Sequence, residues 1–292
     1  MKPSPFAYYA PHTMDEACDI LARQRDGAKV LAGGQSLVPL LNLRLAKVDH
    51  LVDINRVSGL DQIRVAADGV RIGARVTQAD VERSAEVKTA LPLLTAGLAH
   101  VGHHQIRNRG TVVGSICHAD PAAELPALWL AVGGELTAKS ASGTRTIRAD
   151  DFFVSYFTTV LQPNEVATEV KFDAGNGSGW SMQEVARRHG DFALVGVVAH
   201  VSVGNGSVSG ARLVVFGAGA TPIRAHAAEQ ALCGAGARKL DAGVLDAAAG
   251  KVAATVAPVD DVHASADYRR YVAGVLTKRA IGEAVQRAVA AA

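Results

Sequence analysis

The sequence has few of the residues on which iron–sulfur clusters and structural zinc sites depend. Its 292 residues include three cysteines, Cys18, Cys117 and Cys233, and none of them forms a Cys-x-x-Cys pair. Such centres are bound by cysteines that recur at short spacings. We therefore expect neither centre in this chain, and we interpret the three thiols as buried and unreactive.

Aromatic residues, net charge and long apolar runs are also scarce. Aromatics make up 5% of the chain, so the core must consist of small aliphatic side chains. The 30 Lys and Arg are balanced by 28 Asp and Glu and are spread along the chain, which excludes a nucleic-acid-binding surface. No apolar run approaches the roughly 20 residues of a membrane span, and residues 1–6 lack the apolar core of a signal peptide. We expect a cytoplasmic protein.

Several familiar site motifs are missing as well. There is no phosphate loop ending in Gly-Lys-Ser/Thr, and no glycine pair is followed by a third glycine at the Rossmann spacing. Residues 118–120, His-Ala-Asp, resemble part of a catalytic dyad, but no Gly-x-Ser-x-Gly elbow supplies a nucleophile. The adjacent His103 and His104 diverge and lack further ligands, so we expect no metal site. The charged run 187–191 fits a phosphate site and a charged turn equally well.

What the sequence does contain is a glycine turn between an apolar strand and a helix. Residues 32–37, Ala-Gly-Gly-Gln-Ser-Leu, follow a strand predicted over 29–32. We call residues 32–37 the first glycine loop. Glycine lets the backbone turn sharply and lets a ligand approach the main chain, and the N–H groups of such a turn can face a phosphate. A glycine pair also fits a turn that binds nothing.

The helix after this loop has predicted features of its own. Ser36 is expected to cap its N-terminus, and Pro39 is tolerated in its first turn. Its buried stripe is expected to consist of four leucines, namely Leu37, Leu40, Leu41 and Leu45.

Residues 1–56 form the first predicted subdomain, a β-α-β-α-β unit. Its first helix begins with Thr13 and Glu16 three residues apart, as in a capping box. The predicted strands cover residues 6–10, 29–32 and 51–54.

A second subdomain is expected over residues 57–175. It contains a hairpin, a long helix, a second apolar helix and three further strands, predicted over 62–74, 91–101, 125–132, 135–140, 144–148 and 166–172. The glycine-rich segment 174–179 is the predicted linker.

Residues 176–292 form the predicted C-terminal domain. Three strand-like runs over 180–187, 194–203 and 208–217 precede alanine-rich helices from Ala225 onward. Strands followed by helices predict a small α+β domain, so we expect an α+β protein with domains at 1–175 and 176–292.

A second loop of small residues interrupts the second subdomain. Residues 110–115, Gly-Thr-Val-Val-Gly-Ser, form what we call the second glycine loop. Each loop can face one phosphate of a pyrophosphate through backbone N–H groups. The pair of loops therefore predicts a dinucleotide bound in a cleft between the two subdomains.

Four motifs in order resemble the FAD-binding medium subunit of the molybdenum hydroxylases, the family of carbon monoxide dehydrogenase and xanthine dehydrogenase. The first is the first glycine loop together with Leu43-Arg44-Leu45 and Val52-Asp53-Ile54. The second consists of residues 105–111 and 118–126, and the other two cover residues 157–161 and 187–193. The resemblance spans essentially the whole chain.

The resemblance implies a fold and a role. The fold is a two-subdomain FAD-binding domain of the vanillyl-alcohol-oxidase (PCMH) type, followed by a small α+β C-terminal domain. In the family, a large subunit with a molybdenum cofactor oxidises the substrate, and a small subunit with two [2Fe–2S] clusters relays the electrons. The FAD of the medium subunit collects them and passes them to an external acceptor. The resemblance also implies a dimer of heterotrimers. It implies, too, that no residue of this chain needs to act as a general acid or base.

The resemblance also assigns cofactor-binding residues. It places the pyrophosphate on the first glycine loop, Ala32, Gly33, Gly34, Gln35, Ser36 and Leu37, and on Gly110, Thr111, Gly114 and Ser115 of the second loop. Glu124 matches an acid that binds the ribose of the adenosine half. Val101, Ile106 and Leu161 are implied to pack near the cofactor. Phe192 matches an aromatic residue that contacts the flavin in some relatives, although an ordinary core aromatic fits the sequence too.

One departure from the family pattern is Val113, which replaces the first of two adjacent glycines. If that position requires a positive φ, a β-branched residue there costs about 1–3 kcal/mol. We expect the loop to adapt and FAD to bind. Two other interpretations stay open: a self-sufficient flavin oxidase of the same fold, and an assembly subunit without a cofactor.

Overall fold

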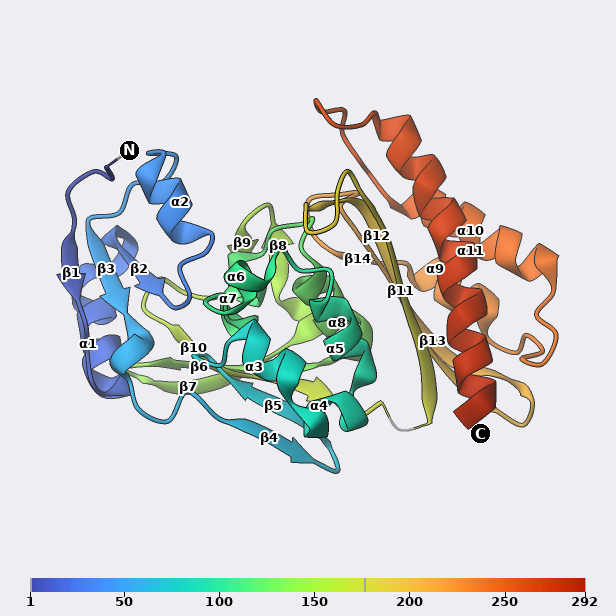
Figure 1. The fold of residues 1–292 in the computed structure, drawn as a ribbon, viewed down its shortest axis with the longest axis horizontal. Helices are drawn as coiled ribbons and strands as arrows, with labels where there is room; N and C mark the ends of the chain where they lie inside the picture. The colour runs from blue at the N-terminus through green and yellow to red at the C-terminus, as the bar shows by residue number, and fades with distance from the viewer. Residues whose placement is uncertain (1, 176, 292) are drawn as a thin grey trace.

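The computed structural model describes residues 2–175 and 177–291, and Figure 1 shows three main sheets with their helices. The first part of the chain is the predicted β-α-β-α-β unit, a parallel sheet in the order β1-β3-β2. Its elements are β1 (Ala7–Tyr9), α1 (Met14–Gln24), η1 (Arg25–Gly27), β2 (Ala28–Leu31), α2 (Leu37–Asn42), β3 (His50–Asp53) and η2 (Ile54–Arg56).

Helix α1 begins with the predicted capping box. The Thr13 side chain accepts a hydrogen bond from the Glu16 N–H, and the Glu16 carboxylate accepts one from the Thr13 N–H. Ala17, Cys18 and Leu21 are buried on one face. Local sequence and packing therefore agree in this helix.

Helix α2 differs from its prediction at both ends. Ser36 already has helical angles (φ −101°, ψ −49°), and its hydroxyl makes no capping hydrogen bond, so the predicted cap is wrong. The helix ends at Asn42, and Arg44 takes a positive φ of 57°. That turn removes Leu45 from the helical face and leaves it 72% exposed, so only Leu41 of the predicted stripe is buried.

The second part of the chain is built on an antiparallel five-stranded sheet in the order β4-β5-β10-β6-β7. Its strands are β4 (Ile63–Ala66), β5 (Gly69–Gly73), β6 (Gly134–Ser140), β7 (Gly143–Arg148) and β10 (Val166–Asp173), with η3 (Ala149–Asp151) and the small hairpin β8 (Phe153–Ser155) and β9 (Thr158–Thr159). The predicted hairpin and the three later strands are confirmed.

Six helices belong to this second part of the chain among the described residues. They are α3 (Gln78–Arg83), α4 (Ala85–Ala90), α5 (Pro92–Leu98), α6 (His104–Arg107), α7 (Val112–His118) and α8 (Glu124–Val132). The helix predicted over 91–101 is shorter, because α5 ends at Leu98 and the chain then turns through Gly102 with φ +50°.

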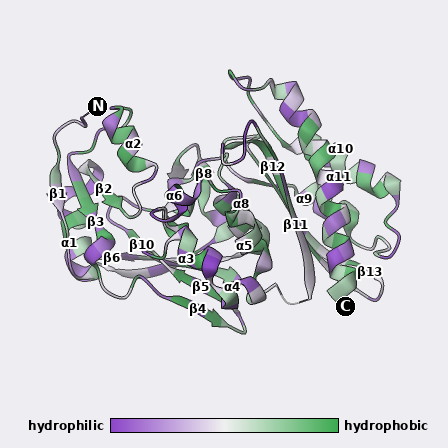
Figure 2. Ribbon diagram, viewed as in Figure 1, coloured by the Kyte–Doolittle hydropathy of each residue, from purple (hydrophilic) through white to green (hydrophobic). Residues whose placement is uncertain are grey.

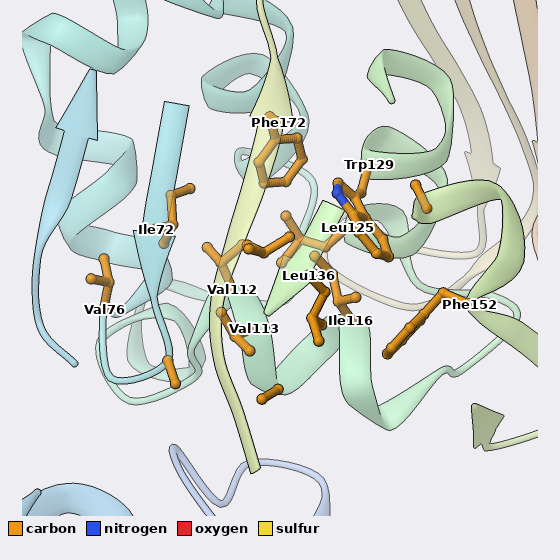
Figure 3. Close-up of a cluster of buried hydrophobic side chains, with 14 of the residues drawn as sticks. Ile72, Val76, Val112, Val113, Ile116, Leu125, Trp129, Leu136, Phe152 and Phe172 are labelled. Carbon is orange, nitrogen blue, oxygen red and sulfur yellow. The ribbon is translucent and has the colours of Figure 1, made fainter. Parts of the chain in front are cut away.

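The core of this part lies between the sheet and helices α7 and α8. Trp129 is fully buried and donates its indole N–H to the Lys171 carbonyl at 2.9 Å. Its ring meets Phe152 edge-on at 5.3 Å between centroids. Figure 3 shows Val112, Val113 and the neighbouring Ile116 within the same cluster. Helix α7 is thereby fixed to the sheet by its apolar side chains.

The third part is a four-stranded antiparallel sheet in the order β11-β12-β13-β14 with three helices. The elements are β11 (Ser178–Ala186), β12 (Ala193–Gly204), β13 (Ser207–Phe216), β14 (Ile223–Arg224), α9 (His226–Leu232), α10 (Ala242–Thr255) and α11 (Ala266–Ala291). Figure 2 shows apolar colouring along β12 and a mixed pattern on α11. Strand β11 begins at Ser178, inside the predicted linker, and Asn176 lies outside the described residues.

Alternate residues of β11 contact different neighbours. Ser181 and Gln183 donate hydrogen bonds to Glu283 of α11, whereas Trp180 and Met182 pack against the core that contains α8. The period of two directs one set of β11 side chains to α11 and the other to the second part of the chain, and the Arg287 guanidinium of α11 also lies 3.9 Å from the centroid of the Trp180 ring.

The interface between these two parts also contains an ion network. Asp150 of η3 accepts hydrogen bonds from Arg212 at 2.7 Å and from Arg224 at 3.0 Å, and these arginines hold the pKa of its carboxyl below the usual value.

The described residues include no helix long and apolar enough to cross a membrane. The expectation that all three thiols are buried is wrong for Cys233, which is exposed just after α9, whereas Cys18 is buried. Burial raises the pKa of Cys117 to about 12, so that thiol is inert at neutral pH.

Candidate functional site

The structure brings the two glycine loops into direct contact. A side chain at Gly33 would overlap the Arg109 carbonyl oxygen, and its Cβ would lie 2.8 Å from the Gly110 Cα. A Cβ on Gly114 would lie 3.8 Å from the Cβ of Ala32. Gly33 and Gly110 are 77 residues apart in sequence. The backbones of the two loops can approach each other this closely because Gly33 has no side chain.

The first glycine loop offers free backbone donors. Gly34 has a φ of +73°, which glycine adopts at low cost. Among the described residues, the N–H groups of residues 33–36 donate no hydrogen bond to the protein, and the first bonded amide is Val38, which donates to the Gly34 carbonyl. Unpaired N–H groups in a glycine turn form an anion site.

Two side chains hold the backbone of this loop. Asn55 donates to the Ala32 carbonyl at 2.9 Å and is itself fixed by Asp53 at 2.6 Å. Gln35 donates to the Gly33 carbonyl at 3.2 Å. The sequence analysis did not identify Asn55; its position directly after the third predicted strand, beside the first loop in a parallel sheet, was the available signal.

The second glycine loop is held by its own helix cap. Thr111 is the N-cap of α7, and its hydroxyl accepts a hydrogen bond from the Gly114 N–H at 3.0 Å. A Cβ on Gly114 would lie 2.6 Å from that hydroxyl, so glycine is needed there. The Gly110 carbonyl accepts from the Gln78 N–H, and the side-chain oxygen of Gln78 is buried with no partner in the described chain. Gln78 is a second neighbour of the site that the sequence analysis did not identify.

Val113 causes no backbone strain. It is the second residue of α7, its φ is not positive, and its side chain is 2% exposed. Figure 3 shows it pointing into the cluster of core side chains. The concern that this position requires a positive φ is therefore wrong for this chain, because the loop ends and the helix begins one residue earlier.

Glu124 lies at the start of α8 and is 4% exposed. Burial raises the pKa of its carboxyl to about 7, its own backbone N–H and the nearby His100 oppose the rise, and the charges of Glu184 and Asp120 add to it. Glu124 is thus an acid with an unusual pKa close in sequence to the second glycine loop, and cofactor sites often contain such acids.

The other predicted contact residues differ in exposure. Val101 is buried, Ile106 is 37% exposed on α6, and Leu161 is half-buried after β9. Phe192 is 60% exposed, which excludes the interpretation as a core aromatic. Gly190, in the same turn between β11 and β12 as Phe192, lies against the His103 ring, because a Cβ there would come within 2.7 Å of it.

The remaining polar candidates have other partners. The His118 ring lies tilted against the Phe157 ring with 5.2 Å between their centroids, and Asp120 accepts a hydrogen bond from the Ala122 N–H. Arg187 pairs with His263 at 3.0 Å in an exposed turn. The Arg187 contact favours a charged turn over a phosphate site, and His118 and Asp120 make their contacts with other residues and not with each other.

The junction of the two loops fits a pyrophosphate. No residue of 32–37 or 110–115 carries a charged side chain, so no carboxylate repels an anion. Free N–H groups and the start of α7 supply hydrogen-bond donors, and two glycines leave the backbone open so that a ligand can approach these donors closely. The residues present therefore fit the diphosphate of FAD, which supplies the redox chemistry when it is bound.

Comparisons with known proteins identify the family of the chain. Residues 4–172 match the family model described as the FAD binding domain in molybdopterin dehydrogenase, and residues 180–284 match the CO dehydrogenase flavoprotein C-terminal domain. Subunit alpha of the 6-hydroxypseudooxynicotine dehydrogenase complex of Paenarthrobacter nicotinovorans is 41% identical over 290 residues, 99% of this chain and 97% of the relative.

Solved and curated carbon monoxide dehydrogenases are similar over the same length. The structure of the Hydrogenophaga pseudoflava enzyme that lacks the Mo-pyranopterin moiety of its molybdenum cofactor superimposes with a TM-score of 0.95 at 38% identity, and covers 98% of this chain and 99% of that one. The medium chain from that organism is 35% identical, over 98% of this chain and 99% of its own length. The chain therefore belongs to the family of FAD-binding medium subunits of molybdenum hydroxylases, electron-transfer subunits of multi-subunit oxidoreductases.

Proposed function

We propose that this chain carries FAD between its two glycine loops, accepts electrons from the [2Fe–2S] clusters of a small subunit and passes them to an external acceptor. The large subunit with the molybdenum cofactor oxidises the organic substrate. The observation that carries the proposal is the contact of Gly33 with Arg109 and Gly110, which joins two uncharged loops with free backbone donors.

The proposal assigns each predicted residue a part. Residues 32–37, Gly110, Thr111, Gly114 and Ser115 hold the diphosphate, Glu124 contacts the ribose, and Val101, Ile106, Leu161 and Phe192 contact the remainder of the cofactor. This chain's own residues bind and orient; none of them transfers a proton to substrate, because the substrate is on another subunit.

The proposal also includes the assembly and its setting. We infer a dimer of heterotrimers with one copy of this chain per heterotrimer, and a division of the chain near residue 175 into an FAD-binding and a C-terminal domain. Three free cysteines support a cytoplasmic location, since reducing compartments keep thiols unpaired.

The proposal is tested by purifying the tagged chain and measuring which cofactors and subunits co-purify with it. We expect FAD, iron and molybdenum in a ratio of one FAD to four iron atoms to one molybdenum, and a native mass of two heterotrimers. A purified chain that oxidises an organic substrate alone would favour the self-sufficient oxidase, and a folded complex without flavin would favour the assembly subunit.

A further inference from the structure

A series of hydrogen bonds connects the three strands of the first sheet to the first glycine loop. Tyr8 of β1 donates its hydroxyl to Asp53 Oδ2 at 2.6 Å. Asp53, the last residue of β3, accepts two further hydrogen bonds on Oδ1, from the Asn55 backbone N–H at 2.8 Å and from Asn55 Nδ2 at 2.6 Å. Asn55 Nδ2 also donates to the Ala32 carbonyl at 2.9 Å, directly after β2.

The two partners of Asn55 Nδ2 fix the orientation of the Asn55 amide. A carboxylate oxygen and a carbonyl oxygen accept hydrogen bonds and do not donate them. The amide oxygen would therefore face two other oxygens if the amide were turned over, so the NH2 group must lie between Asp53 and Ala32. Asp53 thus determines which end of the Asn55 amide meets the first glycine loop.

A hydrogen bond to the Ala32 carbonyl also orients the N–H group of Gly33. A peptide unit is planar and trans, so its C=O and N–H groups point in opposite directions. The Gly33 N–H must therefore point away from Asn55. Gln35 acts on the next peptide unit in the same way, because it donates to the Gly33 carbonyl at 3.2 Å and so directs the Gly34 N–H away from its own amide.

The two oriented N–H groups are suited to an anion. Neither of them donates a hydrogen bond to the described part of the chain. Gly34 has a φ of +73°, whereas Gly33 has no positive φ, and a change of hand between successive residues is typical of backbone nests that bind anions. Because glycine rotates freely, the direction of these N–H groups depends on the side chains that hold the two carbonyls.

We propose that Asp53 and Asn55 are positioning residues for the cofactor, which hold the Ala32–Gly33 peptide unit so that the Gly33 N–H faces the diphosphate of FAD. Tyr8 supports Asp53 from β1, and Figure 1 shows β1, β3 and β2 side by side. This inference rests on the proposed function, because it takes the anion at the first glycine loop to be the FAD diphosphate. It assigns a role to side chains that act through the backbone of the loop.

The proposal predicts that position 53 needs a hydrogen-bond acceptor and not a negative charge. In Asp53→Asn the amide oxygen can still accept both hydrogen bonds from Asn55, whereas Asp53→Leu has a similar size and accepts none. We expect Asp53→Asn to bind FAD within about threefold of the wild type. Asp53→Leu and Asn55→Leu should each raise the FAD dissociation constant about tenfold, and Tyr8→Phe should raise it by about threefold at most.

The experiment measures the FAD dissociation constant of the assembled complex by flavin fluorescence, after removal and re-addition of FAD. It also measures the inhibition constants of ADP and adenosine as competitors, since ADP carries the diphosphate and adenosine does not. Asp53→Leu and Asn55→Leu should raise the inhibition constant of ADP about tenfold and leave that of adenosine unchanged. A merely structural role would weaken both competitors equally.

The matched control is Asp241→Leu at the start of α10. Asp241 accepts a hydrogen bond from the backbone N–H two residues on, from Gly243 at 2.7 Å, as Asp53 does from Asn55. The control removes the same kind of local hydrogen bond in the C-terminal part of the chain. Its FAD dissociation constant should equal that of the wild type.

The outcomes separate the two proposals. A wild-type complex that binds no FAD overturns the proposed function. A complex that binds FAD overturns only this inference if Asn55→Leu binds it as tightly as the wild type, if Asp53→Asn binds it as weakly as Asp53→Leu, or if ADP and adenosine are weakened equally. If the leucine variants do not assemble, amide hydrogen exchange of the wild-type complex decides: FAD must slow exchange at Gly33, and unchanged exchange there overturns the inference.

Discussion

The two glycine loops reach the same junction by different physical means. The second loop is held locally, by the Thr111 cap and the buried start of α7. The first loop has no cap, and its position depends on Asn55 and on close contact with Arg109 and Gly110. A site can thus combine one half that a helix cap stabilises with another half that has no cap.

The largest effect is expected from Gly33→Ala, which disrupts the close contact between the two loops. The new methyl group would overlap the Arg109 carbonyl, so the loops must separate. We expect at least a tenfold loss of FAD affinity and a loss of about 1–3 kcal/mol of unfolding free energy. FAD content and chemical denaturation of the complex measure both.

The control for that variant is Gly282→Ala in α11, where a Cβ meets nothing within 4 Å. It should leave FAD content unchanged. Equal FAD content in Gly33→Ala and Gly282→Ala would show that the contact between the loops is not required.

Val113→Gly tests the buried start of α7. The change removes a fully packed side chain and places glycine inside a helix, so the unfolding free energy should fall by about 2–3 kcal/mol. FAD affinity should not improve, since no strain is relieved. Tighter FAD binding by Val113→Gly, measured by titration, would contradict the assignment of Val113 to the helix core.

Thr111→Val removes the cap of the second loop and keeps the shape of the side chain. The Gly114 N–H loses its acceptor, and we expect a loss of about 1 kcal/mol of stability together with weaker FAD binding. Thermal unfolding of the purified complex measures the first effect. An unchanged midpoint would mean that the loop does not depend on its cap.

Ser36→Ala is the matching change in the first loop, and its expected effect is the smallest. Because the Ser36 hydroxyl caps nothing, stability should change by less than about 0.5 kcal/mol. A loss as large as that of Thr111→Val would show that the hydroxyl does cap α2.

The sequence predicted the elements whose signals are local. The capping box at Thr13, the hairpin of β4 and β5 and the apolar helix α8 depend on residues within a few positions of each other. The order of the elements was sufficient for the fold class, and the two glycine loops were found because small residues interrupt apolar structure.

Features that depend on tertiary contacts were not predicted. The exposure of Leu45 follows from the left-handed turn at Arg44, which no local pattern specifies. Asn55 and Gln78 support the loops from other elements, and the His100–Glu184 hydrogen bond joins residues 84 positions apart. The question of a positive φ at Val113 depends on where α7 begins, and Val113 is the second residue of that helix and has no positive φ.

The most direct test of the joined loops is a cryo-electron microscopy map of the assembled, FAD-loaded complex. The account predicts the diphosphate between residues 33–36 and the start of α7, within hydrogen-bond distance of backbone N–H groups from both loops. A diphosphate held by one loop alone, or bound elsewhere on the chain, would contradict it.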